Sequence, residues 1–446
     1  MRSLTAMAGR AVLALALALS PGRGEDLGDW LARAEGGDPD AQNEIGVCRD
    51  NGLGMAEDAQ EAVKWFRKAA AQGHAGAQAN LGICYSNGHG VIQDAQEAVK
   101  WYQLAAAQGE ARAQHNLGAC YWNGAGVPQD PQAAAGWFRQ AALQGDASSQ
   151  VALGLCYVRG FGVAKDEQEA VKWFRQAAAQ GDADAQNHLG ICHANGQGVA
   201  KDEEEAVKWF RQAAAQGNAE AQHNLGVCHE RGVGVAKDAL EAAEWYRQAA
   251  QQGDADAQTA LGVCYYNGHG VPQDAQEAAR WYQKAAAQGQ AAAQRNLGLC
   301  HRDGEGAPQD AQAAAKWLRM AAGQGDATAQ NELGVCYAEG RGVDKDAAAA
   351  AGWYLKAARQ GHAIAQNNLG ACYAEGEGVD KDAAAAAEWF EKAARQGQMN
   401  AQYNLGICHD EGIGVTKDPQ EARKWFEKAA AQGHEDAARR LQEMKK

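Results

Sequence analysis

All eleven cysteines of this 446-residue chain stand 36 residues apart, from Cys48 to Cys408, without an insertion or a deletion. A fixed period of this length is typical of a repeat array, in which each unit packs only against its neighbours. Eleven of the thirteen tryptophans keep the same step, from Trp65 to Trp425. The period therefore predicts one array of eleven units rather than several separate domains.

Each unit is predicted to be a pair of helices, called helix A and helix B, joined by a glycine-rich turn. In the unit from Asp254 to Gly289, Asp254 is a good N-cap for helix A, and the Asn-Gly-His-Gly segment 267–270 ends that helix. Asp274 is expected to cap helix B, and Glu277 to complete a capping box with it. Gly289 then ends helix B.

The apolar residues fall on one stripe of each helix when 100° per residue is assumed. Ala77, Leu81 and Cys84 share a stripe of helix A, and Ala62 and Phe66 share a stripe of helix B. One helix pair cannot bury these stripes alone, but stacked pairs can. The predicted fold is therefore all-α, a right-handed α-α superhelical solenoid.

The two ends of the chain depart from the period. Residues 1–24 are predicted to be a signal peptide, because basic Arg2 and Arg10 accompany an apolar run at 11–19 that is too short to span a bilayer. Cleavage after Ser20 or after Gly24 is compatible with the pattern. Capping helices are expected at 25–37 and 434–446, on either side of eleven repeats at 38–433. No other stretch predicts a membrane span.

The formal charge of −14 argues against two classes of partner. Loss of residues 1–24 would remove three arginines and no acid, leaving a charge of −17. Such a surface repels phosphate backbones and anionic lipids, so nucleic acid is not expected as a partner.

The repeated cysteines do not predict a metal site or a disulfide ladder. There is one cysteine per unit and no C-x-x-C pair. Equivalent positions on stacked helices lie ~8–10 Å apart, whereas the Cα atoms of a disulfide lie within ~7 Å. Each cysteine is therefore expected to be a small buried hydrophobe. The eleven Gly-x-Gly segments are interpreted as turns, because the aspartate that follows each of them would repel phosphate. No pattern indicates catalytic residues, a metal or a cofactor.

The unit LGVCYYNGHGV…D…EAARWYQKAAAQG resembles the Sel1-like repeat, a 36-residue relative of the tetratricopeptide repeat (TPR). The resemblance covers the whole chain after the leader. It implies a curved superhelix whose concave wall is lined by helix A, and a non-catalytic scaffold or adaptor that binds other proteins. The secreted cysteine-rich branch of the family has two cysteines per unit. This chain has one, so the disulfides and the penicillin binding of that branch do not transfer to it.

The units differ most on the helix A face that we expect opposite the core stripe, which includes the positions of Ala79 and Ser86 and, beside them, that of Asn80. Asparagine can donate to and accept from a peptide backbone, and Trp, Tyr and Arg are enriched at binding hot spots. The predicted protein-binding groove contains His115, Asn116, Trp122, His223, Asn224, Thr259, Tyr266, Arg295, Asn296 and Arg302. The alternative is that the residues on this face vary without being selected for binding.

The sequence thus predicts an exported, non-catalytic scaffold that binds a protein or peptide and has no cofactor. One alternative is a protein that binds or hydrolyses cell-wall peptides or β-lactams, as suggested for the cysteine-rich branch. Another is a spacer that holds two components apart. The sequence does not predict an oligomeric state.

Overall fold

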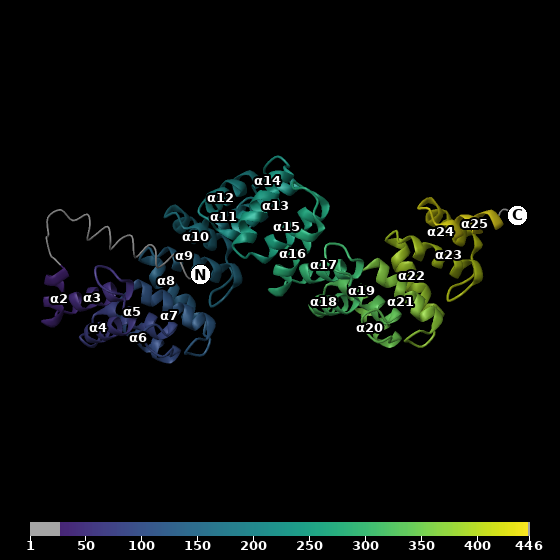
Figure 1. The fold of residues 1–446 in the computed structure, drawn as a ribbon. Helices are drawn as coiled ribbons and strands as arrows, with labels where there is room; N and C mark the ends of the chain where they lie inside the picture. Colours follow the sequence, from purple (N-terminus) through teal and green to yellow (C-terminus); the bar gives the residue numbers. More distant parts are fainter. Residues whose placement is uncertain (1–26, 445–446) are drawn as a thin grey trace. The chain divides into compact units, whose positions relative to one another are not determined.

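The computed structural model describes residues 27–444, which hold 24 α-helices and no strand (Figure 1). The leader expected at 1–24 lies outside the described residues. The chain divides into two compact units, unit 1 up to Asn218 and unit 2 from Ala219 onward. Within each unit, consecutive helix pairs pack as repeats, so the predicted all-α solenoid is confirmed.

Helix A opens every repeat and helix B closes it. The A helices are α3 (Pro39–Asn51), α5 (Ala75–Asn87), α7 (Ala111–Asn123), α9 (Ala147–Arg159), α11 (Ala183–Asn195), α13 (Ala219–Arg231), α15 (Ala255–Asn267), α17 (Ala291–Asp303), α19 (Ala327–Glu339), α21 (Ala363–Glu375) and α23 (Met399–Glu411). The B helices are α4 (Ala59–Ala71), α6 (Ala95–Ala107), α8 (Pro131–Leu143), α10 (Glu167–Ala179), α12 (Glu203–Ala215), α14 (Ala239–Gln251), α16 (Ala275–Ala287), α18 (Ala311–Gly323), α20 (Ala347–Arg359), α22 (Ala383–Arg395) and α24 (Pro419–Ala431). Two further helices, α2 (Leu27–Glu35) and α25 (Glu435–Glu443), lie outside the repeats. None of the helices between residues 27 and 444 is long and apolar enough to cross a membrane.

Aspartate caps begin most of the helices, as predicted, but the capping box is only half formed. Asp274 accepts a hydrogen bond from the Glu277 backbone N–H at 2.9 Å. The Glu277 carboxylate does not return the bond to Asp274. It pairs with Arg280 instead, and the Asp274 N–H donates to the Tyr265 carbonyl. The reciprocal half of the predicted box is therefore wrong, because the Tyr265 carbonyl of the preceding helix A already accepts from that N–H.

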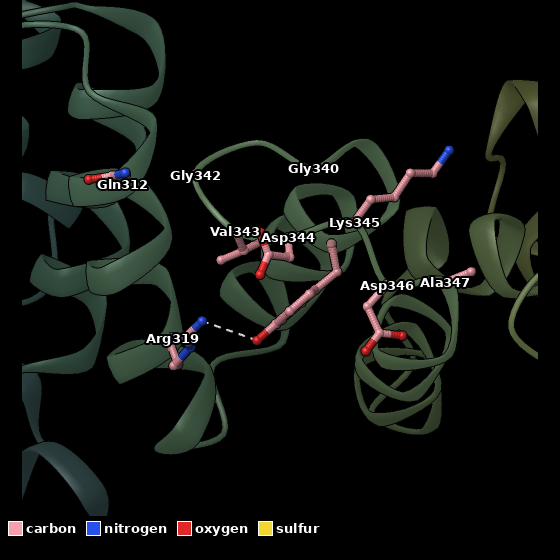
Figure 2. A pocket seen from close by; sticks show the side chains of 10 residues that line it. Gln312, Arg319, Gly340, Gly342, Val343, Asp344, Lys345, Asp346 and Ala347 are labelled. Carbon is pink, nitrogen blue, oxygen red and sulfur yellow. Dashed lines mark hydrogen bonds between the residues drawn. The ribbon is translucent and has the colours of Figure 1, made fainter.

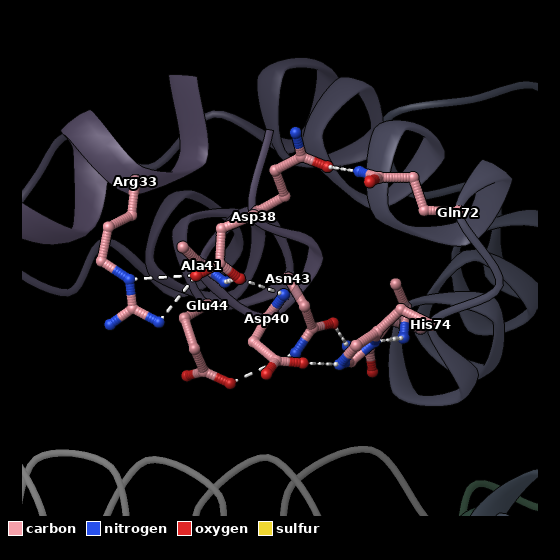
Figure 3. Close-up of polar contacts among 11 residues, drawn as sticks. Arg33, Asp38, Asp40, Ala41, Asn43, Glu44, Gln72 and His74 are labelled. Atoms are coloured by element: carbon pink, nitrogen blue, oxygen red, sulfur yellow. Dashed lines mark hydrogen bonds and ion pairs between the residues drawn. The ribbon is translucent and has the colours of Figure 1, made fainter. Parts of the chain in front are cut away.

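The first described repeat shows how charge supports a cap (Figure 3). Asp38 caps α3 and accepts hydrogen bonds from Arg33 at 2.7 and 3.0 Å. The Arg33 guanidinium lowers the pKa of Asp38. His74 caps α5 through Nδ1, which accepts from Ala77 N at 2.9 Å, while its Nε2 lies 3.1 Å from Asp40. One histidine thus links the first turns of two successive A helices.

The predicted apolar stripe of helix A is confirmed, and a glycine completes it. Ala77 and Leu81 are fully buried, and Cys84 is nearly so. A Cβ at Gly82 would overlap one edge of the Tyr102 ring of helix B, so glycine is needed where this ring packs against helix A. A Cβ on Gly90, the second glycine of the turn, would overlap a backbone carbonyl of the preceding helix B. This close approach joins successive repeats.

A buried glutamine of helix A bridges two successive B helices. In α5, Gln78 Nε2 donates to the Ala70 carbonyl near the end of α4 at 3.2 Å, and its Oε1 accepts from Gln108 after α6 at 2.7 Å. The second bond recurs in every repeat at 2.7–2.9 Å. Since a buried carbonyl without a partner is costly, this ladder fixes how repeats stack.

Candidate functional site

All the residues predicted to line a groove lie on A helices. In unit 1, α7 carries His115, Asn116 and Trp122; in unit 2, α13 carries His223 and Asn224, α15 carries Thr259 and Tyr266, and α17 carries Arg295, Asn296 and Arg302. Tyr266 is 36% exposed, Thr259 is buried, and the others are half-buried. Most of these side chains are therefore partly covered by neighbouring repeats, and their role in binding stays a prediction.

The helix A position represented by Ala79 was expected on an open face, and this is wrong for several repeats. Ala79 is 0% exposed, Asn187 1% and Asn331 2%. The reason is that the next helix A covers this position. The amide of Asn80, for example, donates to Asn43 Oδ1 of the preceding repeat at 3.0 Å. At the same position, Thr259 turns back and donates to the Ala255 carbonyl of its own helix at 2.8 Å.

His115 joins Ser149 and Asp146, which are the residue types of a hydrolase triad. His115 Nδ1 lies 2.9 Å from Ser149 Oγ and 3.7 Å from Asp146 Oδ2. A triad uses opposite ring nitrogens for the serine and the acid, whereas here one nitrogen faces both. Ser149 is fully buried, and Asp146 caps α9. Burial lowers the pKa of His115. The cluster therefore links α7 to α9 and does not have the geometry for nucleophilic chemistry.

Trp122 belongs to an aromatic cluster at the end of α7. Its ring centroid lies 4.3 Å from that of Phe161 in the next repeat and 6.2 Å from that of Phe138 on α8. The guanidinium of Arg159, the last residue of α9, lies 5.6 Å from the Trp122 ring centroid. Trp122 and Phe161 are half-buried, and Arg159 is exposed. The cluster thus presents aromatic surface next to a positive charge.

The corresponding residues of unit 2 form hydrogen bonds and ion pairs with carboxylates. The Tyr266 hydroxyl donates to Glu305 at 2.5 Å, and Arg295 Nη1 lies 2.8 Å from Asp326. Arg302 pairs with Asp303 on its own helix and with Glu332 on α19. Its hydrogen bond to Asp303 is the main cause that raises the pKa of Arg302, and the hydrogen bond to Glu305 raises the pKa of Tyr266 to about 12. These polar groups already have charged partners.

A pairing rule between successive repeats was missed in the sequence. In three repeats the helix A residue at the position of Ser86 contacts the middle residue of the next Gly-x-Gly turn, 39 residues on. The pairs are Asp50 with His89 at 3.1 Å, Trp122 with Phe161, and Tyr266 with Glu305. Each of these three pairs matches in chemistry, whereas Arg302 and Arg341, at the same two positions, carry like charges. Comparing positions 39 residues apart would therefore have indicated the contact in some repeats only.

Two clefts of unit 2 open where a turn packs on the preceding helix B. The larger one, of about 990 Å³, is lined by Gln312 and Arg319 of α18, Tyr337 of α19, and Asp344 and Asp346 of the next turn (Figure 2). Arg319 donates to the Tyr337 hydroxyl at 3.1 Å. A cleft of about 390 Å³ occupies the same place one repeat earlier. Cationic and acidic side chains share the larger cleft, so it selects neither sign of charge.

The cysteines are free thiols, and all but the half-buried Cys120 and Cys372 are buried. Burial raises the pKa of Cys84 to about 12 and that of Cys264 to about 11. Thiols held in the neutral form are poor metal ligands and poor nucleophiles. No group of histidines, cysteines and carboxylates within 27–444 is arranged to hold a metal ion. The expectation of small buried hydrophobes fits these side chains.

Comparison with known proteins agrees with this geometry. The family model described as the Sel1 repeat matches eleven times, at residues 39–74, 75–110, 111–146, 147–182, 183–218, 219–254, 255–290, 291–326, 327–362, 363–398 and 400–434. The crystal structure of c5321, a protective antigen present in uropathogenic Escherichia coli strains that displays an SLR fold, is 36% identical with a TM-score of 0.74, covering 94% of this chain and 90% of that one.

A second solved structure, a Sel1 repeat protein from Oxalobacter formigenes, is also 36% identical, with a TM-score of 0.51 over 69% of this chain and 89% of that one. Among curated proteins, no sequence matches. The repeated helix pairs, the eleven family matches and these two structures together show that the chain belongs to the Sel1 repeat family.

Proposed function

We propose that this protein is an exported, non-catalytic scaffold that binds a protein or peptide along its A helices. The observation that carries the proposal is the contrast between constant and variable positions. The core stripe, the glycines and the glutamine ladder repeat throughout, whereas the ends of the A helices carry an aromatic or charged pair in some repeats, and this pair differs from one repeat to another. Trp, Tyr and Arg at such positions are the residues on which binding energy usually concentrates.

Two further observations support a binding role. Among the described residues, the polar cluster closest to a catalytic arrangement, at His115, serves inter-repeat packing. The solved relative named as a protective antigen shares the fold along most of both chains. Export is proposed from the apolar leader at 11–19 and agrees with that relative, which is described as an antigen.

Affinity capture with the chain from residue 25 onward tests the proposal. A variant with Trp122→Ala, Tyr266→Ala, Arg295→Ala and Arg302→Ala should lose the captured partner. A control with Leu143→Ala and Leu240→Ala removes exposed apolar side chains from B helices, 68% and 67% exposed, and should retain it. Because Arg295 and Arg302 tie repeats together, both variants must first show wild-type circular dichroism. Equal recovery of the partner by all three proteins would contradict the proposed face.

Export has a separate test. The full chain should be recovered from the extracytoplasmic fraction without its leader, and mass spectrometry of its first peptide should show cleavage after Ser20 or Gly24. An intact leader in the cytoplasmic fraction would contradict export. The described residues do not favour the β-lactam alternative, because Ser149, whose hydroxyl lies 2.9 Å from the His115 ring, is fully buried.

A further inference from the structure

We infer that the aromatic cluster of unit 1, made of Trp122, Phe161 and Arg159, is the docking point for a peptide segment of a partner in which a carboxylate side chain stands next to an apolar one. This inference rests on the proposed function and names the chemistry of the ligand. It concerns a surface within unit 1 alone.

The first argument is the charge state of the cluster. Arg159 is exposed at the end of α9 and has no acidic side chain within ion-pairing distance among residues 27–444, although the chain as a whole carries more acids than bases. Its guanidinium lies over the Trp122 ring at 5.6 Å. The N–H groups along the edge of this guanidinium have no hydrogen-bond partner among residues 27–444, so they are available to donate. A carboxylate fits this edge with two parallel hydrogen bonds.

The second argument is that the cluster is held in place before any ligand arrives. Phe161 lies between Gly160 and Gly162, whose φ angles of 67° and 73° are those of a defined turn. A Cβ on Gly162 would overlap the Pro131 carbonyl of α8, so this turn rests directly on the preceding helix B. The Trp122 ring packs on that of Phe161 at an interplanar angle of 45° and contacts Phe138 edge-on. A rigid aromatic surface loses little conformational entropy on binding, which favours affinity.

The third argument is that no other repeat combines these features. At the position of Trp122 the other repeats carry no tryptophan, and at the position of Phe161 they carry no other aromatic ring apart from histidine. Arg231 holds the same helix position as Arg159 two repeats later, but Ala194 and Val233 stand where Trp122 and Phe161 stand here. Arg231 therefore provides a matched control with the charge and without the aromatic pair.

Selection from a displayed library of random ten-residue peptides tests the inference. The wild-type chain should enrich peptides with Asp or Glu beside Leu, Phe or Pro. Arg159→Glu should weaken the best of these peptides by about tenfold or more, because it replaces a charge-assisted hydrogen bond with repulsion. Arg231→Glu should bind them as the wild type does. Phe161→Ala, which keeps the charge, should also weaken them.

The possible outcomes separate the two levels of the proposal. Enrichment of basic peptides, or of acidic peptides that bind Arg159→Glu as well as they bind the wild type, would overturn this inference and leave a peptide-binding role intact. No enrichment on any folded variant would overturn this inference, whereas the proposed function is decided by the affinity capture described above. Arg159 is exposed, so Arg159→Glu should keep the wild-type circular dichroism, and the Arg231→Glu comparison guards against a general effect of charge reversal.

Discussion

The ends of α7 and α15 have the same place in their repeats and opposite chemistry. In unit 1, Trp122 packs on Phe161 beside Arg159, which has no acidic partner among residues 27–444. In unit 2, Tyr266 donates to Glu305, and in the next repeat Arg302 pairs with Glu332. The backbone around both is the same, with a left-handed glycine cap at Gly124 and at Gly268. A constant framework therefore tolerates a change of chemistry at its edge, which is what a family of scaffolds with different ligands requires.

The strongest test of this comparison is to break the common framework in both units. Gly154→Val places a side chain under Phe174 in unit 1, and Gly334→Val places one under Tyr354 in unit 2. Each should cost about 3 kcal/mol of unfolding free energy, since overpacking forces rings and backbone to move. Hydrogen exchange of the flanking helices measures the loss in each unit separately. A large loss in one unit and none in the other would contradict the idea of one framework.

The glutamine ladder should give the next largest effect. Gln150→Leu leaves the Ala142 carbonyl without its donor in unit 1, and Gln330→Leu does the same to the Ala322 carbonyl in unit 2. A buried carbonyl without a partner costs about 1–3 kcal/mol. The loss should appear as faster hydrogen exchange at the ends of the flanking B helices. The control is Gln129→Leu. Gln129 is exposed in a loop, where its side-chain amide donates to the Trp122 carbonyl, so its loss should change hydrogen exchange little.

The contacts at the ends of the A helices, which we call edge contacts, should contribute to stability in a way that depends on salt in unit 2 but not in unit 1. Loss of the Trp122 ring removes half-buried apolar area worth about 1–2 kcal/mol, whether salt is present or not. Glu332→Gln removes the ion pair with Arg302, worth about 1 kcal/mol at low salt and less at 1 M NaCl, where charges are screened within ~3 Å. Denaturant unfolding of Trp122→Ala and Glu332→Gln at both salt concentrations measures this. The same salt response in the two variants would end the distinction between an apolar edge and an ionic one.

The contrast between framework and edge also explains what the sequence could predict. Caps, turns and the apolar stripe depend on residues close in the chain, so Asp254, Gly268 and Leu81 were assigned correctly. The face represented by Ala79 was misjudged because periodicity describes one helix and not the neighbour that covers it. The glutamines stood at constant positions in every unit, but a partner 30 residues away depends on how the repeats stack. Contacts between residues 39 positions apart, such as Tyr266 with Glu305, also depend on how the repeats stack.

The smallest expected effect concerns the titration of Tyr266, which has the aromatic Trp122 at its place in unit 1. The hydrogen bond to Glu305 raises the pKa of Tyr266 to about 12, above the value of about 10 for a free tyrosine. A raised pKa in the folded state gives stability that is complete below pH 10 and is lost as pH rises through 12. The difference in ultraviolet absorbance between wild type and Tyr266→Phe should therefore show a transition near pH 12. With Glu305→Gln the transition should move toward pH 10, because the neutral amide no longer disfavours the phenolate. If it stays near pH 12 in Glu305→Gln, the ionic character assigned to this edge of unit 2 is wrong.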